Sequence, residues 1–471
     1  MNLAHVLADG AAHHPERTAL LFEGGRVSYH ELDRRAAVAA AALQAQGVEA
    51  DDRVAIKLPN TPDYLAAYFG VLRLGAVAVP LNVLLAQPEV DARLEAATPR
   101  AYVDSPLRGE GEVHVEIAER DEDDPAALLF TSGTTGRPKG AILTHAGIRA
   151  AARFGADALG FDRDDVLLGV APFPHVLGQQ VFVCAFLVGA GVSVVQRFEP
   201  EHALETMTST RTTVIFGVPT MCVALCEAAL SAEALPPLRI AHIGGSAVPV
   251  DVARRFEETF GSAIHEGYGL TEMSGLATTF ALGRRRKAGS VGRPSSSTEM
   301  RIANEDERGV GEVQFRGASV IRGYWNDPEA TAAAIDGKGW LSTGDLGYLD
   351  EDGDLFLVDR KRELIIRGGY NVYPREVEEV LYKHPAVLEA AVVGVPHESL
   401  GEDVAAIVVA RPGVELDPEE LKAWAKERVA AYKYPRHVVL AAELPKSPTG
   451  KILKRSIDLG PLREKLVRVT P

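Results

Sequence analysis

Short apolar runs alternate with longer helical stretches over the first 280 residues of the chain. The runs have the length of buried strands, and Ala/Leu-rich or amphipathic segments separate them. The candidate strands are residues 54–58, 77–79, 101–103, 166–170, 192–195, 214–216, 240–243 and 264–268. Strands that are apolar on both faces and alternate with helices predict largely parallel sheets covered by helices on both sides. Two wound halves are expected.

Capping signals define several helices within this pattern. Ser28 and Glu31 have the spacing of a capping box, so a helix is expected from there to Gln46. A proline suits the first turn of a helix over residues 62–74. The longest apolar run, residues 181–195, is shorter than the ~20 residues that span a bilayer and contains two glycines. It predicts a buried helix, a glycine turn and a buried strand rather than a transmembrane segment.

The pattern changes near residue 284. Short apolar runs such as residues 312–316 and 355–358 now lie between closely spaced glycines and acidic turns, which is typical of short antiparallel strands. A third region follows, and its pattern predicts a small α+β domain. Its expected elements are helices at 374–384 and 418–429 and strands at 387–395, 404–409 and 437–440.

Composition narrows the class of protein. A chain of 471 residues is too long for one core, so two or three domains are expected. The net charge of −15 argues against a nucleic-acid binder held by phosphate contacts. The three cysteines, Cys184, Cys222 and Cys226, lack the second pair of a zinc site, and buried free thiols in a reducing compartment are expected. The N-terminus shows no signal peptide, so we expect a cytoplasmic protein.

A loop rich in glycine and hydroxyl groups follows the apolar residues 128–130. It reads Thr131-Ser132-Gly133-Thr134-Thr135-Gly136-Arg137-Pro138-Lys139-Gly140. Glycines let the backbone approach a ligand closely, and hydroxyls, N–H groups and cations suit a polyphosphate. The loop is not a P-loop, because that motif needs glycine before the lysine and Ser or Thr after it. A mobile surface loop of the same composition is the alternative.

Four further segments carry groups that suit a nucleotide. In Gly267-Tyr268-Gly269-Leu270-Thr271-Glu272, an aromatic ring lies between glycines and a carboxylate suited to Mg²⁺ follows. Asp345 and Arg360 could hold a ribose, although a surface turn and a salt bridge would explain them equally. Lys451 stands in a loop shaped by Pro445, Pro448 and Gly450, where it could stabilise negative charge that develops on a phosphate.

In this order, these segments resemble the adenylate-forming superfamily, in its acyl-CoA synthetase branch, over essentially the whole chain. The resemblance implies an α/β N-terminal domain, residues 1–361, with two doubly wound sheets and a small β-barrel-like subdomain at about 284–361. It also implies a small mobile α+β lid, residues 362–471, with its hinge at Arg362. The implied reactants are a carboxylic acid, ATP with Mg²⁺, and coenzyme A. The acid attacks the α-phosphorus of ATP and releases pyrophosphate, and after lid rotation a thiol attacks the acyl-adenylate.

The resemblance assigns roles to individual residues. The catalytic group comprises Lys451 as the adenylation lysine, Glu272 as the Mg²⁺ ligand, Thr271 at the α-phosphate, and His175. ATP binding is assigned to Thr131, Ser132, Gly133, Thr134, Thr135, Gly136, Lys139, Gly244, Gly245, Ser246, Glu266, Gly267, Tyr268, Gly269, Thr271, Asp345, Arg360 and Lys451, with Tyr268 stacking on adenine. Coenzyme A contacts are assigned to Gly368, Gly369, Tyr370 and Lys433.

The resemblance also assigns residues to the pocket that binds the acyl group. Its positions are His175, Leu177, Val181, Ile243, Ser246, Gly267, Gly269, Gly275 and Leu276, and no acidic residue, lysine or arginine is among them. A dicarboxylic acid would need a cation there, so a monocarboxylic acid with an uncharged tail is expected, either fatty or aryl. Leu177 replaces a tyrosine frequent in aryl ligases and favours a fatty acid.

Several alternatives stay open at this stage. They are an aryl-CoA ligase, an acyl-AMP ligase that loads a carrier protein, a nucleotide-binding pseudoenzyme, and a kinase-type phosphotransferase. The expected partners are small molecules, with no nucleic acid. A homodimer, and a lysine acetyltransferase that modifies Lys451, are further hypotheses.

Overall fold

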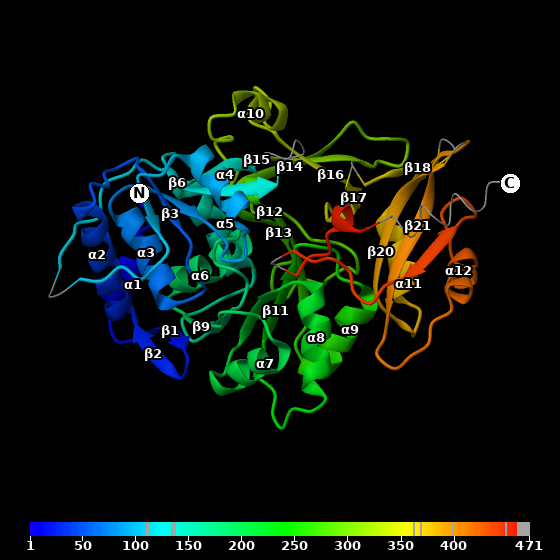
Figure 1. The fold of residues 1–471 in the computed structure, drawn as a ribbon, viewed down its shortest axis with the longest axis horizontal. Coiled ribbons are helices and arrows are strands. Elements are labelled where there is room, and N and C mark those ends of the chain that lie inside the picture. Colours follow the sequence, from blue (N-terminus) through cyan, green and yellow to red (C-terminus); the bar gives the residue numbers. More distant parts are fainter. Residues whose placement is uncertain are drawn as a thin grey trace.

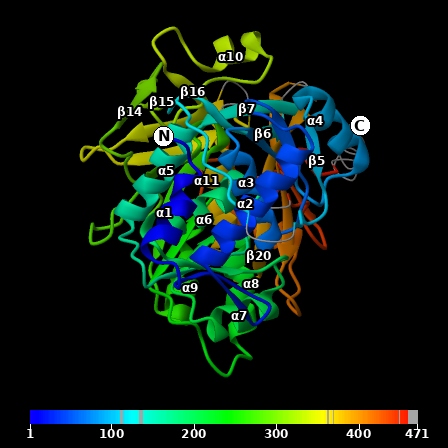
Figure 2. The same cartoon turned by 90° about the vertical axis from the view of Figure 1, so that its left-hand side faces the viewer.

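A computed structural model describes residues 1–109, 113–132, 138–360, 363–367, 370–397, 399–447 and 450–458, without the side chains of Ser132, Arg360 and Asn371. Two sheets with their helices form a large body, an antiparallel sheet lies along one side of it, and a small C-terminal lid packs at one end (Figure 1). Figure 2 shows the N-terminal helices in front of this body. The predicted α/β class and the two wound sheets are confirmed.

The larger sheet of the body has eight strands. Their order is β13 (Gly275–Thr279), β12 (Ile264–Leu270), β11 (Ile240–Gly244), β10 (Val214–Gly217), β8 (Val166–Gly169), β9 (Gly191–Val194), β1 (Thr18–Phe22) and β2 (Gly25–Ser28). Neighbours from β12 to β1 pair in parallel, and the two edge strands pair antiparallel. Parallel strands are joined by crossover helices, and these helices bury both faces of the sheet. This burial explains why the strands are apolar throughout in the sequence.

The second sheet of the body has five strands. Their order is β5 (Ala101–Val103), β3 (Arg53–Ile56), β4 (Val77–Pro80), β6 (Pro125–Ser132) and β7 (Pro138–Thr144). The β6–β7 pair is an antiparallel hairpin, and the residues that join its strands, 133–137, lie outside the described part. The predicted phosphate loop is therefore described only at its two ends.

Helices cover both faces of the larger sheet. One face packs with α1 (His5–His13), α2 (Tyr29–Ala45), α3 (Pro62–Arg73), α5 (His145–Ala158) and α6 (Val176–Val188). The other packs with α7 (Pro200–Ser209), α8 (Pro219–Ala229) and α9 (Val250–Phe260). Helix α4 (Gln87–Ala97) covers the outer face of the second sheet. The predicted cap at the start of α2 is present, because Ser28 Oγ accepts a hydrogen bond from Glu31 N at 3.2 Å.

The lid has a core of its own, whereas the β-rich region shares a core with Tyr268, Met273 and Ala277 of the body. The β-rich region is an antiparallel sheet of β14 (Thr298–Ala303), β15 (Gly311–Gly317), β16 (Leu341–Leu349) and β17 (Leu355–Arg360), with α10 (Pro328–Ala334) beside it. The lid contains β18 (Ile365–Arg367), β19 (Tyr370–Val372), α11 (Pro374–Tyr382), β20 (Val387–His397), β21 (Gly401–Ala410), α12 (Pro418–Lys426) and β22 (His437–Leu440).

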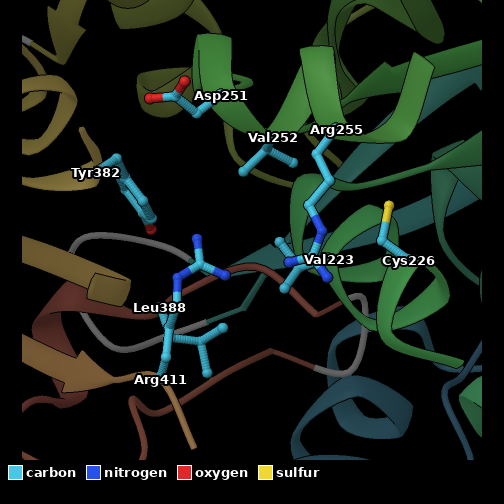
Figure 3. A pocket seen from close by; sticks show the side chains of 8 residues that line it. All are labelled: Val223, Cys226, Asp251, Val252, Arg255, Tyr382, Leu388 and Arg411. Atoms are coloured by element: carbon cyan, nitrogen blue, oxygen red, sulfur yellow. The ribbon is translucent and has the colours of Figure 1, made fainter. Parts of the chain in front are cut away.

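The lid lies against helices α8 and α9 of the body. A cavity of about 30 Å³, the size of a water site, remains between the two surfaces (Figure 3). Its lining is Val223, Cys226, Asp251, Val252 and Arg255 from the body and Tyr382, Leu388 and Arg411 from the lid. A second contact joins the β-rich region to the lid: Nη2 of Arg308 donates to the hydroxyl of Tyr373 at 2.8 Å. The lid therefore contacts both the body and the β-rich region.

The cysteine prediction is confirmed: Cys184, Cys222 and Cys226 are buried free thiols. No helix in the described part of the chain is long and apolar enough to cross a bilayer.

Candidate active site

The candidate site lies where strands β11 and β12 end. The two strands run in parallel with Gly244 opposite Gly267, so the segments after both strands emerge at one edge of the sheet. A Cβ on Gly244 would lie 2.6 Å from the carbonyl oxygen of Gly267, so this close approach needs glycine. Residues 244–246 and 266–269, which the resemblance assigns to ATP binding, are therefore neighbours in space.

Tyr268 joins this edge to the β-rich sheet. Its hydroxyl donates to Asp345 Oδ2 at 2.5 Å, and both residues are only 8% exposed. Asp345 on β16 also lies opposite Arg360 on β17 in the antiparallel pairing. Tyr268, Asp345 and Arg360 come from separate motifs, and the resemblance assigns all three to the nucleoside of ATP. The structure brings these three positions together; of Arg360 only the backbone is described.

Glu272 follows in a short 3₁₀ helix (Thr271–Met273), and a residue that the sequence analysis missed holds its carboxylate. Tyr324 donates its hydroxyl to Glu272 Oε1 at 2.8 Å. The ammonium group of Lys139 lies 5.4 Å from the centre of the same ring. Tyr324 thus connects the predicted Mg²⁺ ligand with the end of the predicted phosphate loop. Its only signal in the sequence was an aromatic residue after a glycine.

His175 caps the N-terminus of α6. Its Nδ1 accepts a hydrogen bond from Leu177 N at 3.1 Å, so this nitrogen carries no proton and the neutral ring presents its N–H at Nε2. Part of the ring surface reaches solvent, yet the surrounding protein desolvates it. That desolvation, followed by the positive charge of Lys451, lowers the pKa of His175. His175 of the body and Lys451 of the lid are therefore close enough for the ammonium charge to act on the imidazole.

The loop that carries Lys451 is attached to the body. Thr220 at the start of α8 donates its hydroxyl to the carbonyl of Gly450 at 2.9 Å, across 230 residues of sequence. Gly450 has a φ of +83°, a conformation that favours glycine. Within the loop, Lys451 N donates to Ser447 Oγ at 3.1 Å. This orientation of the lid brings the Lys451 loop to the segment between β10 and α8.

Glu266 is close to lid helix α11. Burial raises the pKa of its carboxyl to about 7, and the positive charge of Arg375 partly opposes that shift. Arg375 itself donates from its backbone N to Asp359 Oδ2 at 3.1 Å and from Nη1 to the carbonyl of Leu357 at 2.8 Å. Glu266, which the resemblance assigns to ATP binding, therefore lies near the lid.

The predicted coenzyme A residues are only partly described. Tyr370 is 59% exposed and stacks on Tyr432 with ring centres 4.7 Å apart. Lys433 forms an ion pair with Glu376 at 2.6 Å. Gly368, Gly369 and the predicted hinge Arg362 lie outside the described residues.

The predicted acyl-pocket residues do not all lie on one face of the large sheet. Val181 packs on the side of α5 and α6, whereas Ile243 packs among α7, α8 and α9. The preceding residue, His242, was not predicted. Its side chain lies beside Gly267 on the face of α5 and α6.

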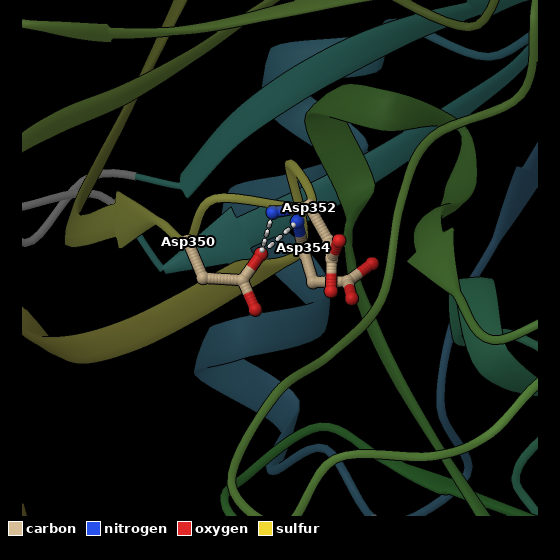
Figure 4. Close-up of side chains that lie close together, drawn as sticks. All are labelled: Asp350, Asp352 and Asp354. Atoms are coloured by element: carbon tan, nitrogen blue, oxygen red, sulfur yellow. Dashed lines mark hydrogen bonds between the residues drawn. The ribbon is translucent and has the colours of Figure 1, made fainter.

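A group of three carboxylates lies away from these residues, on the β16–β17 turn (Figure 4). Asp350, Asp352 and Asp354 could hold a cation, but Lys287 forms ion pairs with all three. Oδ1 of Asp350 also accepts hydrogen bonds from the backbone N of Asp352 and Asp354. Paired carboxylates of this kind explain the turn without a metal.

Comparison with known proteins gives the family. The AMP-binding enzyme family matches residues 7–325, and the AMP-binding enzyme C-terminal domain matches residues 376–451. A long-chain-fatty-acid–CoA ligase of Bacillus subtilis (strain 168) is 34% identical, over 97% of this chain and 94% of the relative. A feruloyl-CoA synthase of an Amycolatopsis species is 37% identical, over 94% and 96%. The crystal structure of ATP-bound MatB from Rhodopseudomonas palustris has a TM-score of 0.90, with 30% identity and full coverage of both chains.

These matches span both domains, and they agree with the motifs in the sequence. They also agree in reaction class, because the two named relatives form thioesters of coenzyme A from carboxylic acids. The chain belongs to the AMP-binding enzyme family and is an AMP-forming acyl-CoA synthetase, which uses ATP and coenzyme A.

Proposed function

We propose that the residues gathered where β12 ends carry out the adenylation half-reaction on a monocarboxylic acid with an uncharged tail. Two observations support the proposal: Tyr268, which precedes Glu272 on the chain, bonds to Asp345, and the loop of Lys451 is bonded to the body with its charge close to His175. In this assignment, Tyr268 stacks on adenine, Asp345 and Arg360 hold the ribose, and Thr271 donates to the α-phosphate. Gly244, Gly245, Ser246, Glu266, Gly267 and Gly269 complete the adenine side.

The chemistry needs charge stabilisation rather than a protein nucleophile. The carboxylate of the substrate attacks the α-phosphorus of ATP, and pyrophosphate leaves. Lys451 stabilises the negative charge that develops at the α-phosphate, and the Nε2–H of His175 donates a hydrogen bond to the reacting carboxylate. Glu272 holds the Mg²⁺ ion, which neutralises phosphate charge when bound, and Tyr324 orients that carboxylate. Thr131, Ser132, Gly133, Thr134, Thr135, Gly136 and Lys139 hold the phosphates that leave.

The second half-reaction needs another lid orientation. After residues 362–471 rotate about Arg362, the thiol of coenzyme A attacks the acyl carbon of the acyl-adenylate, a thioester forms and AMP leaves. Gly368, Gly369, Tyr370 and Lys433 then line the thiol path, and the ion pair between Lys433 and Glu376 must open or move. Large lid motions of this kind commonly use a few residues at the ends of elements as hinges.

Pocket composition supports the uncharged tail. Leu177, Val181, Ser246, Gly275 and Leu276 carry no ionisable group that could pair with a second carboxylate. Fatty and aryl acids both fit this description, and the named relatives include one enzyme of each kind.

The test is to replace Lys451 by Ala and measure the two half-reactions separately. Pyrophosphate exchange should fall by about 10²–10³-fold, the loss typical of removing one preorganised charge-stabilising group. Thioester formation from preformed acyl-adenylate should change little. Lys446→Ala is the matched control, because Lys446 lies in the same loop but pairs with Glu389 at 2.6 Å. Equal loss of both half-reactions in Lys451→Ala would refute the role.

The acceptor and the regulation can be tested with the same protein. Carboxylic acid, ATP and coenzyme A should yield AMP and acyl-CoA, and accumulation of acyl-AMP that only a carrier protein relieves would favour the carrier-loading alternative.

Acetylation of Lys451 by a lysine acetyltransferase would remove its charge and stop adenylation. Mass spectrometry of native protein with Lys451 always unmodified would contradict this. A cytoplasmic location and a homodimer belong to the same proposal, and the homodimer can be checked by light scattering.

A further inference from the structure

The side chain of Asn60 is buried at the junction of the two sheets of the body. Asn60 follows β3 of the second sheet and is 3% exposed. Its Nδ2 donates to two carbonyls at the end of β8 in the large sheet, that of Ala171 at 3.0 Å and that of Gly169 at 3.3 Å. The carbonyl of Val195, just after β9, lies 3.4 Å from the same nitrogen. One amide thus ties the second sheet to the ends of two neighbouring strands of the large sheet.

The same amide holds the turn that leads to His175. Oδ1 of Asn60 accepts a hydrogen bond from the backbone N of Phe173 at 2.8 Å, while Nδ2 holds the carbonyl of Ala171. These two bonds lie on either side of Pro172. The carbonyl of Pro172 in turn accepts a hydrogen bond from the backbone N of His175 at 2.9 Å. Asn60 therefore fixes both neighbours of the residue to which the His175 backbone is bonded.

Packing holds this turn from its other sides. The ring of Phe173 is 1% exposed and packs between Tyr64 of α3 and Phe182 of α6, with ring centres 5.5 Å and 5.4 Å away. A Cβ at Gly178 would lie 2.2 Å from the carbonyl oxygen of Pro172, so the first turn of α6 rests directly on this turn. The backbone before His175 is thus enclosed between α3, α6 and the Asn60 amide.

We propose that Asn60 is a positioning residue for adenylation, which acts on the carboxylic acid through His175. This inference rests on the proposed function, because it takes the Nε2–H of His175 to meet the reacting carboxylate. Removal of the amide would leave the carbonyl of Ala171 and the N–H of Phe173 without these bonds, and buried backbone groups left unpaired cost free energy. The turn would shift to recover partners and would carry His175 with it.

A double-mutant cycle of wild type, Asn60→Ala, His175→Ala and the double variant tests this coupling by pyrophosphate exchange. The probe acid is dodecanoate or ferulate, whichever the wild type activates faster. Asn60→Ala should lower exchange at subsaturating acid by about 10- to 100-fold, the scale of a displaced reacting group, and leave the KM for ATP nearly unchanged. In the His175→Ala background the same substitution should cost less than about twofold, because the group that it positions is gone.

Asn2→Ala is the matched control. Asn2 is 2% exposed, and its Nδ2 also donates to two backbone carbonyls, that of Leu72 at 2.7 Å and that of Ala118 at 2.9 Å. Its loss should lower Tm as well, but the KM for the acid should not change. If Asn60→Ala does not fold, Asn60→Ser, which keeps a hydroxyl donor near the same carbonyls, is carried through the same cycle.

A measurement without turnover completes the test. In protein labelled with ¹³C at histidine Cε1, the resonance of His175 is identified by its absence in His175→Ala. This resonance should shift in Asn60→Ala and stay in place in Asn2→Ala. An unshifted resonance in Asn60→Ala, or an equal loss of exchange in both backgrounds of the cycle, would overturn the proposal. If the resonance shifts but His175→Ala exchanges like the wild type, the link from Asn60 to His175 stands, and the assignment of His175 to the reacting carboxylate fails instead.

Discussion

The hydrogen bond from Thr220 to the carbonyl of Gly450 gives a direct test of how the lid is held. Thr220→Val removes the hydroxyl and nearly preserves the shape of the side chain. A partly buried neutral hydrogen bond contributes about 0.5–1.5 kcal/mol, which corresponds to about a 2- to 12-fold change in the balance between lid orientations. The bond exists only when the Lys451 loop lies on the body. Its loss should therefore weaken the orientation that places Lys451 at the candidate site.

The measurement compares the half-reactions. Pyrophosphate exchange should fall within that range in Thr220→Val, whereas thioester formation from preformed acyl-adenylate should stay the same or rise. Thr208→Val is the control, because the Thr208 hydroxyl donates only within α7, to the carbonyl of Leu204 at 2.8 Å. If exchange is unchanged, or if both half-reactions fall equally, the reasoning about Thr220 is wrong.

Three further outcomes are expected. Tyr324→Phe frees the Glu272 carboxylate and should raise the Mg²⁺ concentration for half-maximal pyrophosphate exchange by about 2- to 10-fold; an unchanged titration curve would argue against the coupling. Burial lowers the pKa of His145 to about 4, well below the ordinary ~6.5 of the unfolded chain. The unfolded state therefore binds more protons below pH ~6.5, and the stability from neutral His145 is complete above that pH and lost as pH falls towards ~4. His145→Gln should accordingly show a smaller drop in Tm between pH ~7.5 and ~5.0 than the wild type, and an equal drop would contradict the assignment. Arg362→Pro should spare pyrophosphate exchange and slow thioester formation, so an unaffected overall rate would exclude Arg362 as the hinge.

Local elements could be predicted from the sequence because burial and capping leave short-range signals. The helix expected from Ser28 to Gln46 and the observed α2 agree within one residue at the C-terminal end. Predicted boundaries are wrong where backbone pairing with a neighbouring strand extends an element beyond its apolar residues. Strand β20 runs to His397, beyond the predicted residue 395, because Pro396 and His397 pair with Glu402 and Gly401 across the hairpin.

Long-range partners could not be predicted from local pattern. Tyr324 reaches Glu272 across 52 residues, and no spacing rule connects them. His242 reads as one polar residue inside an apolar strand. Only the parallel register of β11 and β12 brings it beside Gly267, and no local pattern could indicate that neighbour.

The first hairpin of the chain has a consequence for biosynthesis and for how far the protein can be shortened. Strand β1 (Thr18–Phe22) pairs with β9 (Gly191–Val194), so the large sheet gains two of its strands from the first 28 residues of the chain. During synthesis, about 170 further residues must be added before the partner strand exists, and such non-local pairing slows folding. Removal of the hairpin would leave β9 as an open, apolar edge, which is a template for aggregation. A truncation before residue 29 is therefore expected to reduce solubility while leaving every candidate active-site residue in place.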